Sequence, residues 1–388
     1  MLKNSIVKIR EKSQAPVHID VWTEHIQENQ KLCDDDNLNI VEFIPWKFPI
    51  VILRILLVNL ICRKTCVGSQ AKGILGSIYH ADLFFDISGI SFLDERNATF
   101  LLYDTLIALP AILLKKPIIK ASQALGPFHN PLNKILASFI LPRITWIYAR
   151  GKETLSSLQQ FGLKNISLAA DIGFYDESLF VAKPLDSMGH SRRPIIGISV
   201  SSVVWSKCQK MGIDYVKVLN EFIQYLLTTH EASIILIPHA IKYDGKMRNN
   251  DIPVIEQILV TSQSEHVYFF KEMEHPYELR QLIATCDFLF ASRFHAMISS
   301  LSVGVPVIIL GWSHKYREVL DLFDLPDCFI TFKDLNVENV IRVFERLFPQ
   351  RASLAKNLTS KIEDVRTLAD VNFFRIPEFL SDGKLIRK

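Results

Sequence analysis

Apolar runs of five or six residues alternate along most of the chain with segments in which apolar residues recur at helical spacing. Strands buried in parallel sheets are continuous apolar runs, and helices that cover a sheet show a 3.6-residue period. The alternation therefore predicts an α/β fold, with parallel sheets covered by helices on both faces. The predicted strands are 17–22, 39–44, 83–87, 117–121, 144–149, a short one near 166–170, and then 195–200, 233–237, 266–270, 287–291 and 306–310. Helical spacing is clearest in 152–161, 276–285 and 351–369.

The strand series is interrupted at residues 181–194, where the sequence VAKPLDSMGHSRRP is rich in Pro, Gly, Ser and charge and has no periodicity. A chain of 388 residues is also too long for one ordinary hydrophobic core. We therefore predict two Rossmann-like domains that face a cleft, an N-terminal one at 1–180 and a C-terminal one at 195–388, with a linker at 181–194.

One apolar run is longer than a strand. Residues 48–62 read FPIVILRILLVNLIC and contain Arg54. The run is shorter than the roughly 20 apolar residues that span a bilayer. Two interpretations stay open, a buried helix and a helix that lies on a membrane surface. Because Arg54 is costly at a bilayer centre but can reach water from the interface, any membrane attachment through 46–63 is expected to be peripheral.

Composition and charge narrow the class of protein. Hydrophobic residues make up 49% and charged residues 22% of the chain, which excludes a generally disordered protein. The formal net charge is only +3, and no basic run with interleaved aromatics occurs, so we predict no nucleic-acid partner. The six cysteines form no CxxC pair, and the N-terminal MLKNSIVKIREKSQ has no apolar core of signal-peptide length. These two features predict reduced thiols and a cytoplasmic location.

Several polar side chains directly follow predicted strands, and ligands of open parallel sheets bind beyond the carboxyl ends of the strands. In a two-lobed protein with facing lobes, these side chains would converge on one cleft. Structural interpretations also exist, because Arg150 can pair with Glu153 and Asp171 can cap the turn before Gly173. The candidates are Arg150, Asp171, His239, Arg293, His295, Ser313, His314 and Lys315.

Arg293 and His295 carry the strongest of these signals. They belong to the motif SRFHA, which joins a buried strand to a helix of small residues, and Phe294 between them is expected to anchor the segment in the core. Such an arrangement holds a guanidinium and an imidazole toward the same space. Arg binds a carboxylate or phosphate through two parallel hydrogen bonds, and His transfers protons near neutral pH. The pair is therefore predicted to be functional.

A second signal is the segment SQALGPF, which follows the predicted strand 117–121. Its Gly126-Pro127 step fixes a tight turn and brings the backbone close to the space beyond the sheet. Ser122, Gln123 and Gly126 are therefore candidate substrate-binding residues. An ordinary strand-to-helix loop is the alternative interpretation.

In this order, the segments resemble the polysaccharide pyruvyl transferase family. SQALGPF resembles its Ser/Gln-x-x-Gly-Pro-Phe segment, ITWIYAR with Glu153 resembles its strand ending in Arg, and AADIGF at 169–174 resembles its Asp-x-x-Phe stretch. The block CDFLFASRFHAMISSLSVGVPVIIL resembles its Arg-x-His-Ala motif followed by Gly-x-Pro. Lys315 falls near a lysine often found after that strand. The resemblance covers about residues 15–345 and keeps its order throughout.

The resemblance implies a fold similar to the two-lobed GT-B glycosyltransferases. It also implies transfer of a pyruvyl group from phosphoenolpyruvate to two hydroxyls of a sugar or lipid-linked saccharide, forming a cyclic ketal. Nothing in this chemistry requires a metal or another cofactor. The matching cations are Arg150, Arg293 and His295, with His295 as the acid that protonates the methylene carbon. His239 and Lys315 are further candidates for contact with the substrate.

Two features depart from the family pattern. Family members begin with a strand and a Gly-x-x-Asn-x-Gly-Asp loop, whereas this sequence opens on the helical pattern KNSIVKIREKS. The first sheet is therefore expected to lack its N-terminal strand. The glycine-rich stretch after the third strand is only ISGIS, around Gly89. Two alternatives stay open, a GT-B glycosyltransferase that uses a nucleotide sugar and a non-catalytic relative.

Overall fold

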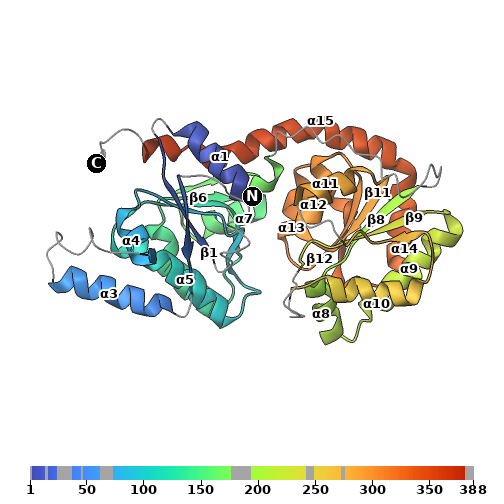
Figure 1. The fold of residues 1–388 in the computed structure, drawn as a ribbon, viewed down its shortest axis with the longest axis horizontal. Helices are drawn as coiled ribbons and strands as arrows, with labels where there is room; N and C mark the ends of the chain where they lie inside the picture. The colour runs from blue at the N-terminus through green and yellow to red at the C-terminus, as the bar shows by residue number, and fades with distance from the viewer. Residues whose placement is uncertain are drawn as a thin grey trace. The chain divides into compact units, whose positions relative to one another are not determined.

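The computed structural model describes residues 2–13, 16–23, 37–44, 47–61, 73–175, 194–241, 249–271 and 276–380. The chain divides into two compact α/β units (Figure 1). Unit 1 consists of Met1–Tyr175 and Thr367–Lys388, and unit 2 consists of Asp176–Arg366. Apart from Pro194, the predicted linker 181–194 lies outside the described residues.

Unit 1 is built on a parallel sheet in the order β3-β5-β6-β7, and β4 pairs with β5 as well. A separate parallel pair joins β1 to β2. All of these strands except β4 lie at predicted apolar runs. β4 was missed because it has four residues and starts only four residues after β3 ends. The strands are β1 (Ile19–Thr23), β2 (Leu38–Glu42), β3 (Phe84–Asp86), β4 (Ile90–Leu93), β5 (Ile118–Gly126), β6 (Trp146–Ala149) and β7 (Ile166–Leu168).

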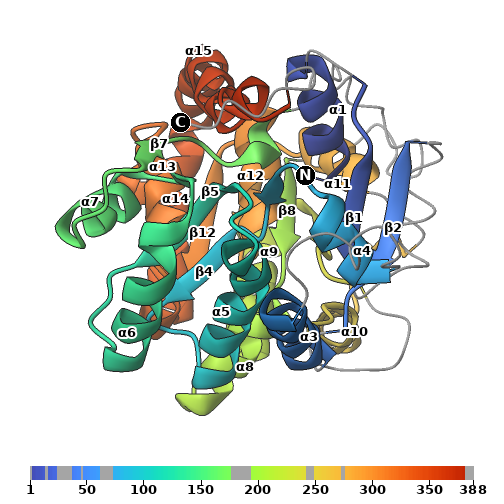
Figure 2. The same cartoon turned by 90° about the vertical axis from the view of Figure 1, so that its left-hand side faces the viewer.

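The helices of unit 1 cover these strands, and α5 packs beside both α3 and α6 (Figure 2). Their starts follow from local sequence: the side chain of Asn97 accepts a hydrogen bond from the Phe100 amide at the start of α5, and that of Asn130 accepts one from the Leu132 amide at the start of α6. The helix expected at the beginning of the sequence is confirmed as α1. The helices are α1 (Leu2–Lys12), α3 (Phe48–Ile61), α4 (Gly73–His80), α5 (Ala98–Leu113), α6 (Pro131–Ile140) and α7 (Lys152–Gln160).

α3 corresponds to the long apolar run at 48–62, and only one of its faces is buried. Phe48, Val51, Ile52 and Ile55 lie in a core cluster that also includes residues of α4 and α5. The opposite face is exposed. Within the described ranges, no helix is long and apolar enough to cross a membrane.

Unit 2 contains a six-stranded parallel sheet in the order β10-β9-β8-β11-β12-β13. Numbered within the unit, this is the order 3-2-1-4-5-6 of dinucleotide-binding Rossmann sheets. All but β13, which has three residues, lie at predicted apolar runs. The strands are β8 (Ile195–Ser199), β9 (Ser233–Ile237), β10 (Val267–Tyr268), β11 (Phe288–Ala291), β12 (Val307–Gly311) and β13 (Phe329–Thr331).

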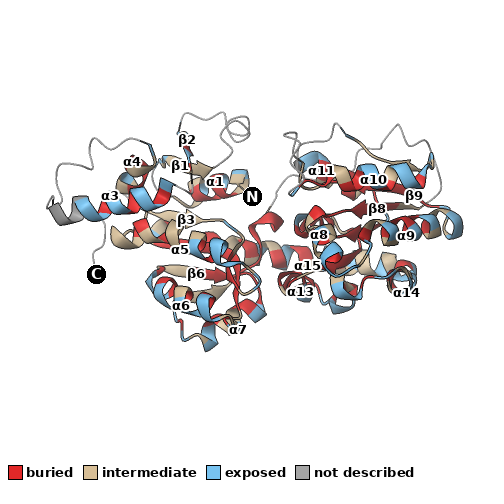
Figure 3. Ribbon diagram, turned by 90° about the horizontal axis from the view of Figure 1, so that it is seen from below, coloured by how far each residue is buried: buried red, intermediate tan, exposed pale blue. Residues whose placement is uncertain are grey.

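Helices cover the sheet of unit 2, whose central strands are buried while the outer sides of the helices are exposed (Figure 3). α9 is a representative case: Leu219, Phe222, Ile223 and Leu226 are buried, and this spacing places them on one side of the helix. The helices are α8 (Ser202–Lys210), α9 (Tyr215–Thr229), α10 (Ile252–Ser262), α11 (Pro276–Ala284), α12 (Phe294–Ser302), α13 (Lys315–Asp321) and α14 (Val337–Leu347).

The C-terminal helix α15 (Arg351–Asp370) matches the helix predicted at 351–369 and leads the chain back to unit 1. There Asn372 accepts a hydrogen bond from the Ser122 amide at 2.7 Å and donates one to the Ala170 carbonyl at 3.0 Å. Phe373 and Ile376 lie in a core cluster of unit 1. The sequence-based division kept 195–388 together, whereas the structure assigns 367–388 to the first unit because these contacts lie there.

Candidate active site

The predicted site residues of unit 2 lie at the carboxyl edge of its parallel sheet. His239 follows β9, Arg293 and His295 follow β11, and Lys315 comes after β12. β8 and β11 are hydrogen-bonded neighbours, and from β8 the chain continues to one side of the sheet while from β11 it continues to the other. The loops after β8 and β11 therefore flank the switch point, where open α/β sheets bind ligands.

Arg293 is held by a buried carboxylate that the sequence analysis did not single out. Its Nε lies 3.1 and 2.9 Å from the two oxygens of Asp251, and its Nη2 also contacts Asp251 Oδ1. Nη1 donates to Asn249 Oδ1 at 2.8 Å, and Nη2 donates to Ser202 Oγ at 3.1 Å. Asp251 is fully buried, and the Arg293 side chain is partly buried. The edge of the guanidinium formed by Nε and Nη2 thus binds the Asp251 carboxylate in this structure.

Asp251 also connects the loops that follow two neighbouring strands. Its Oδ1 accepts a hydrogen bond from the Ser202 amide at 2.9 Å, after β8. Its Oδ2 accepts bonds from the amides of His239 and Ala240 at 3.1 and 2.9 Å, after β9. Together with Arg293, this carboxylate fixes the backbone at the switch point. The sequence contains little indication of this role for Asp251, because an Asp before Ile-Pro at a helix start indicates only a helix cap.

His239 lies among positive groups in a partly buried position. Its Nδ1 is 3.2 Å from Ser199 Oγ, at the end of β8. Burial, followed by the charges of His295, Arg293 and Arg280, lowers the pKa of His239 to about 3. The imidazole is therefore neutral at physiological pH and suited to hydrogen bonding. Arg293 and Arg280 are thus among the charges that act on His239 at this edge of the sheet.

We expect the imidazole NMR signals of His239 not to titrate between about pH 5 and 8 in the free protein, because its pKa is lowered to about 3. The unfolded chain binds this proton near pH 6.5, so the stabilising contribution of neutral His239 is present above that pH. It is lost as the pH falls toward 3. Inorganic phosphate bound at the site offsets the neighbouring charges and is expected to raise the pKa. Titration near pH 6.5 without a ligand contradicts this prediction.

His295 is exposed in the first turn of α12. Phe294 beside it is buried, as expected for an anchor, and its ring lies edge-on to the rings of His295 and Tyr316. A helix begins with backbone N–H groups that have no helical acceptor, and these favour anions. The start of α12 therefore places an imidazole and a row of amides at the same edge as Arg293.

Lys315 lies at the start of α13 and is buried among aromatic rings. Its Nζ is 4.9 Å from the ring centres of both Phe294 and Trp312. Such rings stabilise an ammonium ion without neutralising it. Ser313 is buried, and His314 Nε2 lies 3.8 Å from Glu318, a contact too long for a hydrogen bond. Lys315 and His295 thus both contact the ring of Phe294.

In unit 1, Arg150 forms a buried ion pair. Its Nη1 lies 2.8 Å from Asp171 Oδ2, and its Nη2 donates to the Gly89 carbonyl at 2.7 Å. The pairing partner is therefore Asp171, where the structural interpretation of the sequence had Glu153. The other oxygen of Asp171 accepts a hydrogen bond from the Gly173 amide at 2.8 Å, as expected of a cap. This network ties the short glycine loop after β3 to the ends of β6 and β7.

The SQALGPF segment differs from the loop that the sequence predicted, because β5 continues through Gly126 and all nine of its residues are buried. Ser122 accepts a hydrogen bond from the Ile172 amide on its Oγ, at 3.3 Å. Gln123 contacts Ser91 Oγ and donates to the Asp86 carbonyl at 3.3 Å. The strand is longer than its apolar run because buried polar residues continue it. Their described contacts are with the protein itself.

A second buried ion pair in unit 1 was missed. Lys120 Nζ lies 2.6 Å from Asp86 Oδ2, between the neighbouring strands β5 and β3. Burial alone would raise the pKa of Asp86, but the charge and hydrogen bond of Lys120 lower it to about 2. Lys120 interrupts an apolar strand, which was the available signal. The carboxyl edge of this sheet therefore carries two ion pairs, Lys120–Asp86 and Arg150–Asp171.

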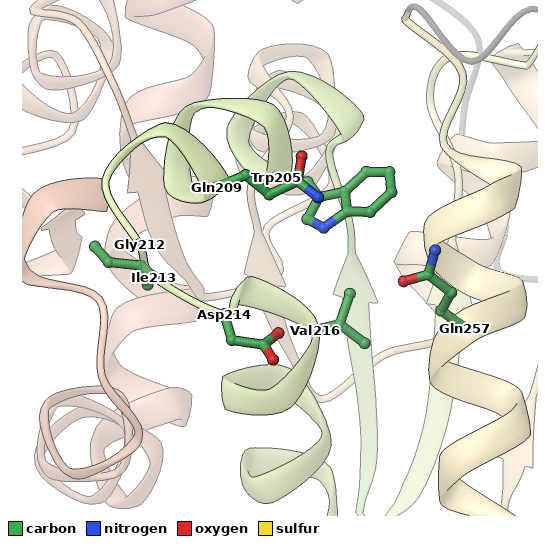
Figure 4. Close-up of a pocket in the computed structure, with 7 residues that line it drawn as sticks. All are labelled: Trp205, Gln209, Gly212, Ile213, Asp214, Val216 and Gln257. Carbon is green, nitrogen blue, oxygen red and sulfur yellow. The ribbon is translucent and has the colours of Figure 1, made fainter.

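A separate surface hollow of about 440 Å³ lies in unit 2, away from the predicted residues. Figure 4 shows Trp205 of α8 and Gln257 of α10 facing each other across it, with Asp214 nearby. The residues that line the hollow include no Lys or Arg. It is therefore poorly suited to a small dianion, in contrast to the edge around Arg293.

Sequence comparisons locate these residues within a known family pattern. A family model described as polysaccharide pyruvyl transferase matches residues 11–314, a range that includes Arg150, Arg293 and His295 and ends one residue before Lys315. The amylovoran biosynthesis protein AmsJ of Erwinia amylovora is 20% identical over 280 residues. The match covers 68% of this chain and 65% of AmsJ, which is just under two thirds of its length.

Solved structures share the fold. A UDP-GlcNAc 2-epimerase from Neisseria meningitidis, bound to UDP-GlcNAc, superposes with a TM-score of 0.58 at 11% identity, covering 95% of this chain and 94% of the epimerase. The Methanocaldococcus jannaschii UDP-GlcNAc 2-epimerase, in complex with UDP-GlcNAc and UDP, gives 0.53 at 12% identity, with 89% and 88% covered. The predicted class of two Rossmann-like domains of GT-B type is confirmed, and at these identities the likeness shows the fold alone.

Proposed function

Because this chain belongs to the polysaccharide pyruvyl transferase family, we propose that it transfers a pyruvyl group from phosphoenolpyruvate to a sugar of a polysaccharide or its precursor. Membership confirms the resemblance drawn from the sequence motifs and supports a role in polysaccharide biosynthesis. The product we propose is a cyclic ketal, in which two sugar hydroxyls are joined to the former keto carbon.

One observation carries the choice of site, the cluster of positive groups at the switch point of unit 2. His295, Arg293 and Arg280 are all close enough to His239 to lower its pKa. The start of α12 adds backbone amides at the same place. Phosphoenolpyruvate carries a carboxylate and a phosphate on a three-carbon skeleton. Such a compact anion suits a dense cluster of hydrogen-bond donors. We propose that its donor-binding residues here are Arg293, His295, His239 and Lys315.

The proposed chemistry balances without a metal or cofactor. His295 donates a proton to the methylene carbon, which leaves an oxocarbenium-like centre at the neighbouring carbon. One sugar hydroxyl attacks this carbon and loses its proton. Inorganic phosphate then leaves, and the second hydroxyl attacks and loses its proton to close the ketal. One hydroxyl proton replaces the proton given by His295, and the other leaves with phosphate. Arg293 stabilises the phosphate as its charge develops.

Unit 1 is proposed to hold a set of candidate substrate-binding residues of its own. The candidates are Arg150, Ser122, Gln123 and Gly126 at the carboxyl edge of its sheet. Arg150 is bound to Asp171 and Gly89, so its contact with a donor anion stays a prediction. The buried network around it supports a role in fixing the loop after β3.

We propose a cytoplasmic location, at the membrane surface where lipid-linked saccharides are presented as acceptors. The net charge of +3 and the absence of a basic run in the sequence support the proposal that no nucleic acid is involved.

Calorimetry tests the donor directly. We expect phosphoenolpyruvate to bind with an affinity that falls as salt is added, because the contacts are ionic. A panel of UDP- and GDP-sugars is expected to bind more weakly or not at all, because a nucleotide needs an apolar slot for its base and a carboxylate for its ribose. Tight binding of a nucleotide sugar without binding of phosphoenolpyruvate indicates a glycosyltransferase. Binding of neither indicates a non-catalytic relative.

A further inference from the structure

The exposed side of α3 carries large apolar residues and, among its described side chains, Arg54. Ile50, Leu53, Leu56 and Leu57 have 54, 55, 46 and 45% of their surface exposed. Scattered exposed apolar residues are ordinary, but four large ones on one helix face form a contiguous patch. The other face of the same helix already packs into the core of unit 1. α3 therefore carries apolar residues on both faces, and the described residues cover only one of these faces.

α6 repeats this pattern in the same layer of helices. Leu132, Ile135 and Phe139 are 38, 65 and 48% exposed, and their i, i+3, i+7 spacing places them on one side of α6. α5 lies between the two helices and packs against both (Figures 2 and 3). The inner side of the layer is buried against the sheet of unit 1. We call these seven exposed residues of α3 and α6 the apolar face.

Positive side chains border the apolar face. Lys47, Arg54, Lys134 and Arg143 are exposed at α3, at α6 or directly beside them. The Arg143 guanidinium lies 4.5 Å from the ring of Phe139. Neither α3 nor α6 contains Asp or Glu, and the sequence from 43 to 81 contains five Lys or Arg residues and no acidic residue. The charge is therefore complementary to an anionic surface.

We propose that the apolar face docks unit 1 on the surface of an anionic phospholipid bilayer. Its Leu, Ile and Phe side chains would enter the boundary between headgroups and acyl chains, and the cations around them would bind lipid phosphates. A second copy of the chain is a poorer occupant, because a symmetric contact would bring the like charges of Lys47 and Arg54 together. This surface goes beyond pyruvyl transfer, since it defines where the enzyme works.

Vesicle sedimentation tests the proposal with the full chain. We expect binding to vesicles of phosphatidylglycerol and phosphatidylcholine in equal parts, and binding at least about ten-fold weaker to phosphatidylcholine alone. The double variant Leu53→Asp/Leu57→Asp is expected to lose at least about ten-fold in partition to the mixed vesicles. Arg54→Glu/Lys134→Glu is expected to lose the preference for the anionic lipid. The control is Val260→Asp on α10 of unit 2, since Val260 is 73% exposed and should tolerate the change without affecting binding.

Circular dichroism and the unfolding midpoint confirm that each variant is folded. Carbonate or high-salt washing is expected to release the protein from membranes, and retention in the pellet after carbonate contradicts peripheral docking. Unchanged vesicle binding by Leu53→Asp/Leu57→Asp overturns the proposal. A wild-type dimer that this variant dissociates, without any vesicle binding, identifies a second copy as the occupant and also overturns it. Pyruvyl transfer to a water-soluble acceptor is measured separately for the wild type and each variant. If none of them transfers the group, the proposed reaction is refuted, whereas the result of the vesicle experiment is unaffected.

Discussion

Replacing Arg293 with alanine is expected to abolish pyruvyl transfer and to lower the free energy of unfolding by about 3–5 kcal/mol, because the substitution leaves the buried carboxylate of Asp251 without its cation. Sequence reasoning predicts the loss of activity with an intact fold. The structure adds the stability loss, since Asp251 is fully buried and also holds the Ser202 and His239 amides. Urea unfolding followed by circular dichroism measures the loss of stability, and phosphate release measures the loss of activity.

Three further variants separate the roles of charge and geometry. Arg293→Lys keeps the charge but loses the bidentate fork, so activity is expected to fail while more stability is retained. Asp251→Asn, alone and combined with Arg293→Ala, closes a double-mutant cycle, and a coupling of at least about 1 kcal/mol is expected for groups in direct contact. Arg342→Ala on the exposed side of α14 is the matched control, with a change within about 0.5 kcal/mol. Normal turnover by Arg293→Ala shows that the site lies elsewhere.

The fold was predictable because its strands are buried on both sides and therefore leave continuous apolar runs. β8, β9, β11 and β12 are of this kind. β4 and β13 were missed because three or four apolar residues carry no period of their own. The return of the chain to unit 1 after α15 was also unpredictable, because the packing of Phe373 and Ile376 depends on residues more than 200 positions earlier.

Strand ends located the candidate site residues, but their partners could not be deduced. The rule that ligands bind at carboxyl ends of parallel strands identified Arg150 and Arg293. Asp171 and Asp251, which bind them, are 21 and 42 residues away in sequence. Ion pairing across loops leaves no spacing pattern, so a sequence cannot tell a cation that awaits a substrate from one that already has a carboxylate. Lys120 and Asp86 were missed for the same reason.

His295 offers the sharpest separation of catalysis from stability. His295→Gln is expected to lower kcat by about 10²–10⁴-fold, the range attributed to general acid catalysis, because glutamine cannot donate a proton to carbon. The free energy of unfolding should change by less than about 0.5 kcal/mol, since the ring is exposed at the start of α12. Calorimetry should still detect phosphoenolpyruvate, because Arg293 and the α12 amides remain.

The matched control is His129→Gln, which changes an exposed histidine in unit 1. It should leave kcat, KM and unfolding unchanged. A fall in affinity without a fall in kcat would assign His295 to binding. An unchanged kcat/KM would remove it from the reaction and leave His239, whose pKa a bound anion is expected to raise from about 3, as the next candidate acid.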